Sequence, residues 1–257
     1  MKGPVRAVLF DYGHTLITFE RPETALLQAY EDLNRFLTAR LARDVPAARD
    51  LVVGVSHAVD DEIARYDTSD RLEELEIVTI YDGCLRRLGL ELDPQLIEHV
   101  MEVEQRAWLN GVQVGPDVVP TLDRIREAGL KIGLVSNVAF RSHLMRAQID
   151  YLGLLSYFDS LSFSSEVGYR KPHPAIFTDA LHKLGITAEA ALFVGDRLKE
   201  DIQGAQALGM RTVLVHEWRQ EEDPQGIADF TIGRLGDLWS LLELLRRPSH
   251  TARASYN

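Results

Sequence analysis

The sequence predicts an α/β fold, a Rossmann-like parallel sheet with helices on both faces, together with a helical segment inserted after the first strand. Short apolar runs alternate with helical stretches from Gly115 onward, which is typical of a parallel sheet covered by helices. A long helical stretch separates the first apolar run from the next and predicts the insert. With 257 residues and 46% hydrophobic content, the chain is long enough for a sizeable core.

Six apolar runs are expected to form the strands of the sheet. They are residues 5–10, 131–137, 160–167, 190–196, 211–217 and 229–233. Several of the helical stretches between them close with a glycine, which is common at a helix C-terminus. The first strand is therefore separated from the other five by the insert.

The inserted segment carries apolar residues at three-to-four spacing, as in Leu26, Tyr30, Leu33 and Leu37. Four helices are expected there, at residues 22–43, 47–66, 70–88 and 94–110, and a proline stands near the start of three of them. The resulting division is an α/β core of residues 1–16 and 113–246, a four-helix cap of residues 17–112, and a flexible tail of residues 247–257.

Composition narrows the classes of function. The net charge is −11, and residues 17–112 hold 20 acidic residues against ten arginines and no lysine. An acidic surface repels phosphate backbones, so nucleic-acid binding is not expected. The single cysteine, Cys84, excludes an internal disulfide. No apolar run approaches the roughly 18 residues of a membrane span and no secretory leader is apparent, so we expect a cytoplasmic protein without a membrane partner.

Polar residues stand at the ends of four expected strands. They are Asp11 to Thr15, Ser136 with Asn137, Lys171 in the loop "GYRKPHP", and Asp196 with Asp201 in "GDRLKED". Each alone is a common helix cap or solvated side chain. In an open parallel sheet, however, strand ends meet at one edge, where ligands bind. Carboxylates with a lysine and a hydroxyl suit a hard cation and a phosphate, which predicts a site for both.

Four motifs in order resemble those of the haloacid dehalogenase (HAD) superfamily of hydrolases: "LFDYGHTL", "IGLVSN", "GYRKPHPAIF" and "LFVGDRLKEDIQGAQALGM". The resemblance covers nearly the whole chain, and the helical insert after the first motif is similar to the family's small mobile cap. It implies a Mg²⁺-dependent phosphatase that hydrolyses a small, soluble phosphorylated metabolite through an aspartyl-phosphate intermediate.

The resemblance also implies roles for individual residues at the phosphate. Asp11 is similar to the nucleophile that attacks phosphorus. Ser136 and the backbone of Asn137 are expected to hold phosphoryl oxygens, and Lys171 to neutralise the charge of the transition state. A carboxylate can approach an anionic phosphate only if positive charge offsets the repulsion, so these roles agree with the chemistry.

The metal ligands implied by the resemblance are Asp11, Asp196 and the backbone carbonyl of Gly13. Asp201 would not contact the metal directly but would orient the lysine or a metal-bound water.

Gly13 is also a departure from the family pattern, because phosphatases of the family usually place a second aspartate there as the acid and base. Losing such a group typically costs about 10² to 10⁴ in rate. His14 is a candidate replacement because imidazole titrates near neutral pH; the alternative is that it bonds only to the cap linker.

Three other functions are open to such a sequence. One is a catalytically weak or non-catalytic phosphate-binding relative whose acidic cap binds a protein, which Gly13 motivates. A haloacid dehalogenase is less favoured, since that chemistry works without Mg²⁺ and places a tyrosine where Gly13 stands. Phosphonate hydrolysis is disfavoured because it needs a cap lysine, and residues 17–112 have none.

Overall fold

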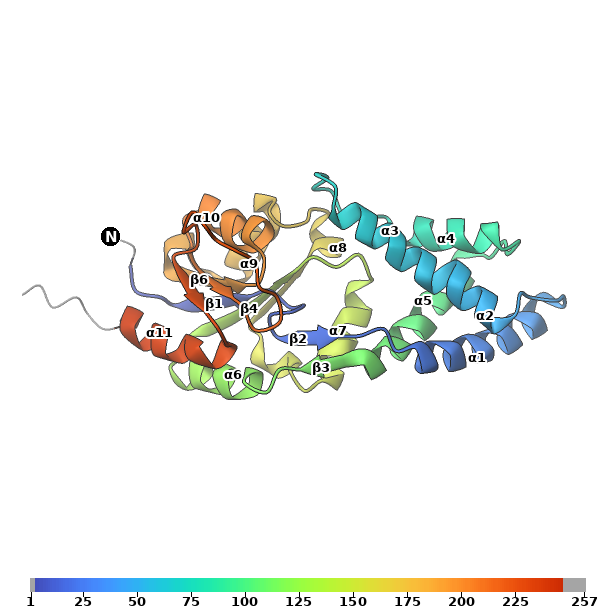
Figure 1. Cartoon of the computed structure of the whole chain (residues 1–257), viewed down its shortest axis with the longest axis horizontal. Coiled ribbons are helices and arrows are strands. Elements are labelled where there is room, and N and C mark those ends of the chain that lie inside the picture. The colour runs from blue at the N-terminus through green and yellow to red at the C-terminus, as the bar shows by residue number, and fades with distance from the viewer. Residues whose placement is uncertain (1–2, 247–257) are drawn as a thin grey trace, which may run out of the picture.

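Six parallel strands form the central sheet of the computed structural model, which describes residues 3–246 (Figure 1). Their order is β5-β4-β1-β6-β7-β8. The bounds are β1 Ala7–Phe10, β4 Lys131–Ser136, β5 Ser160–Phe163, β6 Ala191–Gly195, β7 Arg211–Val215 and β8 Phe230–Ile232. Phe10 at the end of β1 lies between Leu134 of β4 and Val194 of β6, so the next residue, Asp11, emerges beside both neighbouring strand ends.

Helices cover both faces of the sheet, as the sequence predicts. One face carries α6 (Val118–Glu127), α7 (Ser142–Tyr151) and α11 (Leu238–Arg246), and the other carries α9 (Pro174–Leu184) and α10 (Gly204–Ala207). Side chains alternate along β1, so that Val8 and Phe10 join the first layer, and Ala7 and Leu9 the second. The predicted Rossmann-like α/β class is confirmed.

One expected strand, residues 160–167, is too long. The strand β5 ends at Phe163 and a short helix, α8 (Ser164–Val167), follows. The Ser164 hydroxyl accepts a hydrogen bond from the Val138 amide at 2.7 Å, and Gly168 closes the turn with φ of 83°. This side-chain bond and the glycine divert the chain where the apolar pattern alone continues.

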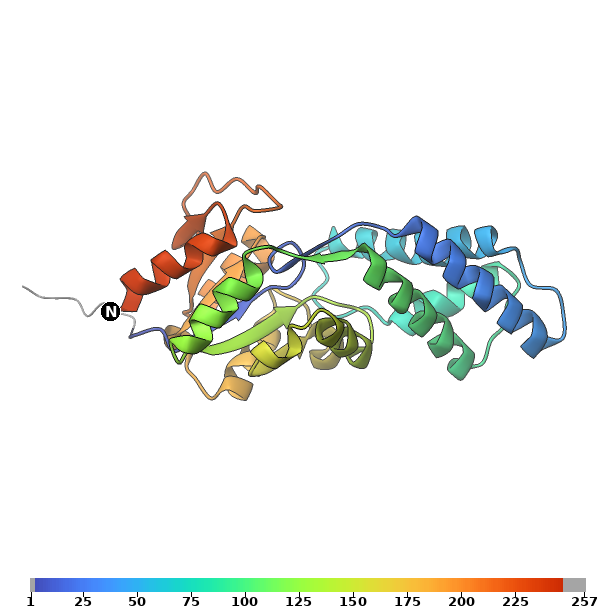
Figure 2. The ribbon, with the colours of Figure 1, turned by 90° about the horizontal axis from the view of Figure 1, so that it is seen from below.

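The inserted residues fold into helices around an apolar cluster of their own. They are α1 (Glu23–Leu41), α2 (Ala48–Leu51), a π-helical turn (Val52–His57), α3 (Ala58–Asp67), α4 (Ile77–Arg87) and α5 (Pro94–Trp108). Figures 1 and 2 show these helices beyond one end of the sheet-containing part. The separate apolar cluster supports our proposal that residues 17–112 form a cap on a core of residues 1–16 and 113–246. The predicted tail, residues 247–257, lies outside the described residues.

The third predicted cap helix begins later than expected, at Ile77 instead of residue 70. The preceding stretch is bound to a loop of the core, because the Arg170 amide donates to the Leu72 carbonyl at 2.7 Å and the Glu74 amide to the Gly168 carbonyl at 2.9 Å. Backbone groups committed to the core loop cannot also form helical hydrogen bonds.

A two-stranded antiparallel ribbon, which the sequence analysis did not predict, joins the two parts. It pairs β2 (Ile17–Phe19) with β3 (Val112–Val114), and the two segments run side by side in Figure 2. Gly111 is needed beside it, since a Cβ there would stand 2.0 Å from the Glu20 carbonyl oxygen.

Short 3₁₀ turns lie between the longer elements, at Leu109–Gly111, Leu155–Tyr157, Ala188–Ala190 and Leu235–Asp237. No helix among residues 3–246 has the length and apolar character to cross a lipid bilayer.

Candidate active site

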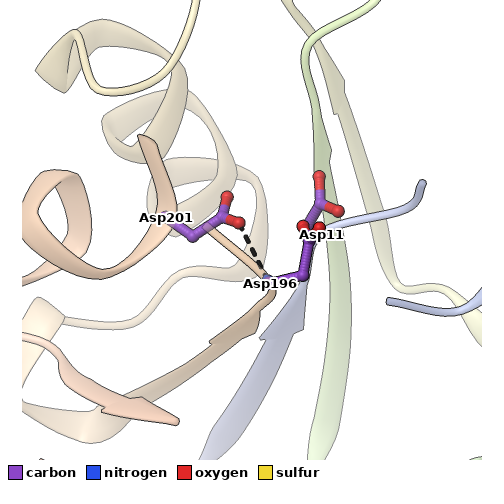
Figure 3. Close-up of side chains that lie close together, drawn as sticks. All are labelled: Asp11, Asp196 and Asp201. Carbon is purple, nitrogen blue, oxygen red and sulfur yellow. Dashed lines mark hydrogen bonds between the residues drawn. The ribbon is translucent and has the colours of Figure 1, made fainter. Parts of the chain in front are cut away.

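Three buried carboxylates gather at the ends of two neighbouring strands (Figure 3). Asp11 follows β1, Asp196 follows β6, and Asp201 lies in the π-helical turn Leu198–Gln203. One oxygen of each lies within 4.8 Å of the others, and the side chains are almost excluded from solvent. Such close carboxylates repel one another unless cations balance them.

Lys171 supplies part of that balance. Its Nζ donates to Asp11 Oδ1 at 2.5 Å and to Asp201 Oδ1 at 2.7 Å. Burial of the ammonium lowers the pKa of Lys171, but the two carboxylates outweigh burial and raise it, so the lysine is charged. The backbone of Lys171 is held by Asn137, whose Oδ1 accepts from the Lys171 amide at 2.7 Å and whose Nδ2 donates to the Lys171 carbonyl at 3.2 Å. This side-chain function of Asn137 was not predicted.

Asp201 is held on both oxygens. Its Oδ2 accepts from the backbone amides of Asp196 at 3.1 Å and Arg197 at 3.0 Å, while Oδ1 accepts from Lys171. Gly195 is required for this packing, because a Cβ there would lie 2.4 Å from the Asp201 carboxyl. The position of Asp201 therefore suits a residue that orients Lys171.

The site holds more negative charge than its cations balance. Burial, and then the Asp11 carboxylate, raise the pKa of Asp196 to about 6. Burial, helped by Asp11 and opposed by Lys171, raises the pKa of Asp201 to about 7. Buried oxygen donors with excess negative charge fit a hard divalent cation.

Arg219 also contacts this cluster. It lies in the loop after β7, and its Nε donates to Asp196 Oδ2 at 2.6 Å. Sequence reasoning missed it, because only four strand ends were inspected. The signal was present in the polar run "HEWRQEED" that follows β7, and β7 is the neighbour of β6 in the sheet.

The loop after Asp11 places Gly13 and His14 at the same site. His14 has φ of 60°, a left-handed conformation that favours glycine, and its amide donates to the Ile17 carbonyl at 2.6 Å. Its ring packs on Phe19 with centroids 4.8 Å apart. Burial, followed by the charge of Arg219, lowers the pKa of His14. A Cβ at Gly13 would stand 3.3 Å from Phe19, so Phe19 takes part of the space above Gly13.

A cavity of about 300 Å³ opens above the carboxylates, a size suited to a small metabolite. All of the predicted site residues line it: Asp11, Gly13, His14, Ser136, Asn137, Lys171, Asp196 and Asp201. The opposite wall comes from the insert and includes Asp60, Ile63, Asp67 and Trp108. The structure thus brings the predicted residues together in one cavity, and their chemical roles remain proposals.

Arg170, next to Lys171, ties the insert to the core. Its guanidinium pairs with Asp67 and with Glu74, the latter at 3.0 Å, and lies over the Tyr66 ring at 5.6 Å. The Arg170 and Glu74 side chains are 10% and 5% exposed, so this pairing is largely shielded from water. It fixes the insert directly beside the loop that carries Lys171.

Comparisons with known proteins agree with this geometry. The family model of haloacid dehalogenase-like hydrolases matches residues 5–209. A glyceraldehyde 3-phosphate phosphatase of Methanopyrus kandleri is 34% identical over 172 residues, covering 65% of this chain and 72% of that protein. The crystal structure of a HAD phosphatase from Thermococcus onnurineus has a TM-score of 0.63 and 25% identity, covering 93% of this chain and 98% of that one. A 2-haloacid dehalogenase from Pseudomonas syringae pv. Tomato DC3000 gives a TM-score of 0.66 and 26% identity, covering 93% and 99%. The family predicted from the four motifs is confirmed: the chain belongs to the haloacid dehalogenase-like hydrolases.

Proposed function

We propose that the protein is a Mg²⁺-dependent phosphatase that hydrolyses the phosphate monoester of a small metabolite through an aspartyl-phosphate on Asp11. The observation that carries this proposal is the buried contact of Asp11 with Lys171 beside Asp196 and Asp201. The phosphatases among its relatives support it.

The chemistry assigned to each residue follows from its position. Asp11 attacks phosphorus, and the charge of Lys171 offsets the repulsion between carboxylate and phosphate. The Ser136 hydroxyl and the Asn137 amide donate to phosphoryl oxygens. The ligands of Mg²⁺ would be Asp11, Asp196 and the Gly13 carbonyl, and the ion supplies the remaining positive charge against the phosphate when bound.

His14 is the proposed replacement for the acid and base that Gly13 lacks. As the acid it would protonate the leaving group, and as the base it would then take a proton from the water that hydrolyses the aspartyl-phosphate. Its lowered pKa favours the second task over the first. His14→Ala is expected to slow alkyl phosphates more than p-nitrophenyl phosphate, because a poor leaving group needs more proton transfer. Equal losses on both substrates would count against this role.

A panel of phosphorylated metabolites assayed with Mg²⁺ tests the proposed function. Turnover is expected for at least one member, and Asp11→Asn should lower it about 10³-fold or more, since the nucleophile is removed. Asp150→Asn, an exposed change on α7, is the matched control and should leave turnover unchanged. Undiminished turnover by Asp11→Asn would overturn the nucleophile.

Gly13 favours one alternative, a relative that binds phosphate and turns over slowly or not at all while its cap binds a protein. Recovery of one protein partner that is lost on charge reversal of the cap, with no turnover of any panel member, would support it. The dehalogenase alternative predicts halide release from 2-haloacids without Mg²⁺, as tested with a halide electrode.

A further inference from the structure

Around the carboxylate cluster, the cavity wall carries no cation among the described residues that is free of an acidic partner. Among the described residues, the Lys and Arg side chains that line the cavity are Lys171, Arg170 and Arg197. Arg170 is shared between Asp67 and Glu74, and Arg197 Nη1 lies 3.4 Å from Glu200 Oε1. Each arginine thus brings acidic groups to the wall with it.

A further acid, Asp60, lines the same wall from α3. Its carboxylate pairs with Arg21 at 2.7 Å, and Arg21 is not a lining residue of the cavity. Burial, followed by the charge of Glu104, raises the pKa of Asp60 to about 6.

The rest of this wall is mostly apolar, although the amides of Gln105 and Gln148 also line the cavity. Phe19, Ile63, Trp108, Phe140 and Met145 line it and offer carbon surfaces instead of charge. A second anion on the substrate would therefore meet carbon surface and the arginine-paired carboxylates of Asp60, Asp67 and Glu200, with no unshared cation to receive it. Like charges brought together across an interface are costly.

We propose that the protein is specific for phosphate monoesters whose organic part carries no second anionic group, such as phosphates of polyols or hydroxy aldehydes. The inference rests on the proposed phosphatase function and adds the class of substrate. Esters that also carry a carboxylate or a second phosphate are excluded by the acidic wall.

Glycerol 3-phosphate and 3-phosphoglycerate test this directly, because they differ only in a hydroxymethyl group replaced by a carboxylate. The expected kcat/KM is about tenfold or more higher for glycerol 3-phosphate. Equal values, or a preference for 3-phosphoglycerate, would overturn the inference and leave the phosphatase function intact. Absence of turnover of both compounds and of p-nitrophenyl phosphate would overturn the function instead. In that case, calorimetry on Asp11→Asn would still compare the dissociation constants of the two compounds. Tighter binding of glycerol 3-phosphate than of 3-phosphoglycerate is expected.

A variant tests whether the acidic wall is the cause. Glu200→Gln leaves Arg197 without its acidic partner. The ratio of kcat/KM for glycerol 3-phosphate over 3-phosphoglycerate should then fall about threefold or more, a modest effect because the Arg197–Glu200 pair is partly exposed to solvent. The control, Glu127→Gln, removes an exposed acid of α6 and should leave the preference unchanged. Higher salt should also reduce the preference, because it screens the wall charges. A preference that none of these changes alters would overturn the acidic wall as its origin.

Discussion

The core and the insert each bury carboxylates, but they satisfy them in different ways. At the sheet edge, Asp11, Asp196 and Asp201 face one another, and charged side chains, Lys171 and Arg219, contact them. In the insert, Glu104 is 1% exposed, and neutral hydroxyls bond both of its oxygens: Tyr30 at 2.6 Å and Ser56 at 2.7 Å.

This difference distinguishes a site that can bind a metal ion or a phosphate, in the core, from a carboxylate with a structural role, in the insert. A carboxylate held by neutral donors inside a helical cluster is satisfied without any ligand. In the core, three carboxylates share two contacting cations, Lys171 and Arg219, and burial together with the charge of Asp11 raises the pKa values of Asp196 and Asp201. The core is therefore the part that should respond to cations and phosphate, whereas the insert should respond to loss of packing and hydrogen bonds.

The largest expected effect is on the core. Lys171→Met removes the cation between Asp11 and Asp201 and should lower the free energy of unfolding by about 3–5 kcal/mol, since a buried pair loses one partner. Denaturant unfolding in a chelator measures it. Lys199→Met breaks a fully exposed pair with Asp70 and should leave the free energy of unfolding nearly unchanged. Equal effects of the two changes would contradict the comparison.

The junction between the parts should show the next largest effect. Arg170→Gln leaves the buried carboxylate of Glu74 without its cation, and a loss of about 2–3 kcal/mol is expected in the same unfolding measurement. Arg141→Gln, which breaks the more exposed pair with Glu98, is the matched control and should stay within about 1 kcal/mol. A control as damaging as Arg170→Gln would show that burial does not set the difference.

The pH dependence of stability sharpens the comparison within the insert. The pKa of Asp60 is raised from 3.8 to about 6, so its stabilising contribution is fully present below pH 3.8 and is lost as the pH rises through 6. A shift of this size corresponds to about 2–3 kcal/mol. Unfolding of wild type and Asp60→Asn between pH 4 and 7 should show a fall of this order in the wild type relative to the variant. Parallel curves would contradict the prediction.

The smallest effect is expected at Glu104. Glu104→Gln keeps the shape of the side chain but weakens two hydrogen bonds to a charged acceptor, so a loss of about 1–2 kcal/mol is expected. The relative kcat/KM for two phosphate esters should not change. Glu102→Gln, two residues earlier on α5 in a more exposed pair with Arg106, is the control for stability. A change in substrate preference with Glu104→Gln would show that this carboxylate acts on the cavity.

The sequence predicts the sheet and most of the site because the signals are local. Each strand is an apolar run, and Asp11 and Asp196 immediately follow one. Arg219 was missed because its role depends on β7 lying next to β6, and the late start of α4 depends on backbone contacts with Gly168 and Arg170. Such long-range contacts override the local pattern, and the polar run after β7 does not by itself show which of its residues reaches the site.

Trapping of the covalent intermediate tests the central claim most directly. The protein is mixed with a turned-over phosphate ester and Mg²⁺, quenched with acid within the first turnover, and digested for mass spectrometry. We predict one phosphoryl group on the peptide that contains Asp11, and none in Asp11→Asn. Phosphate release by the wild type without any phosphorylated Asp11 peptide, together with full activity of Asp11→Asn, would contradict the account.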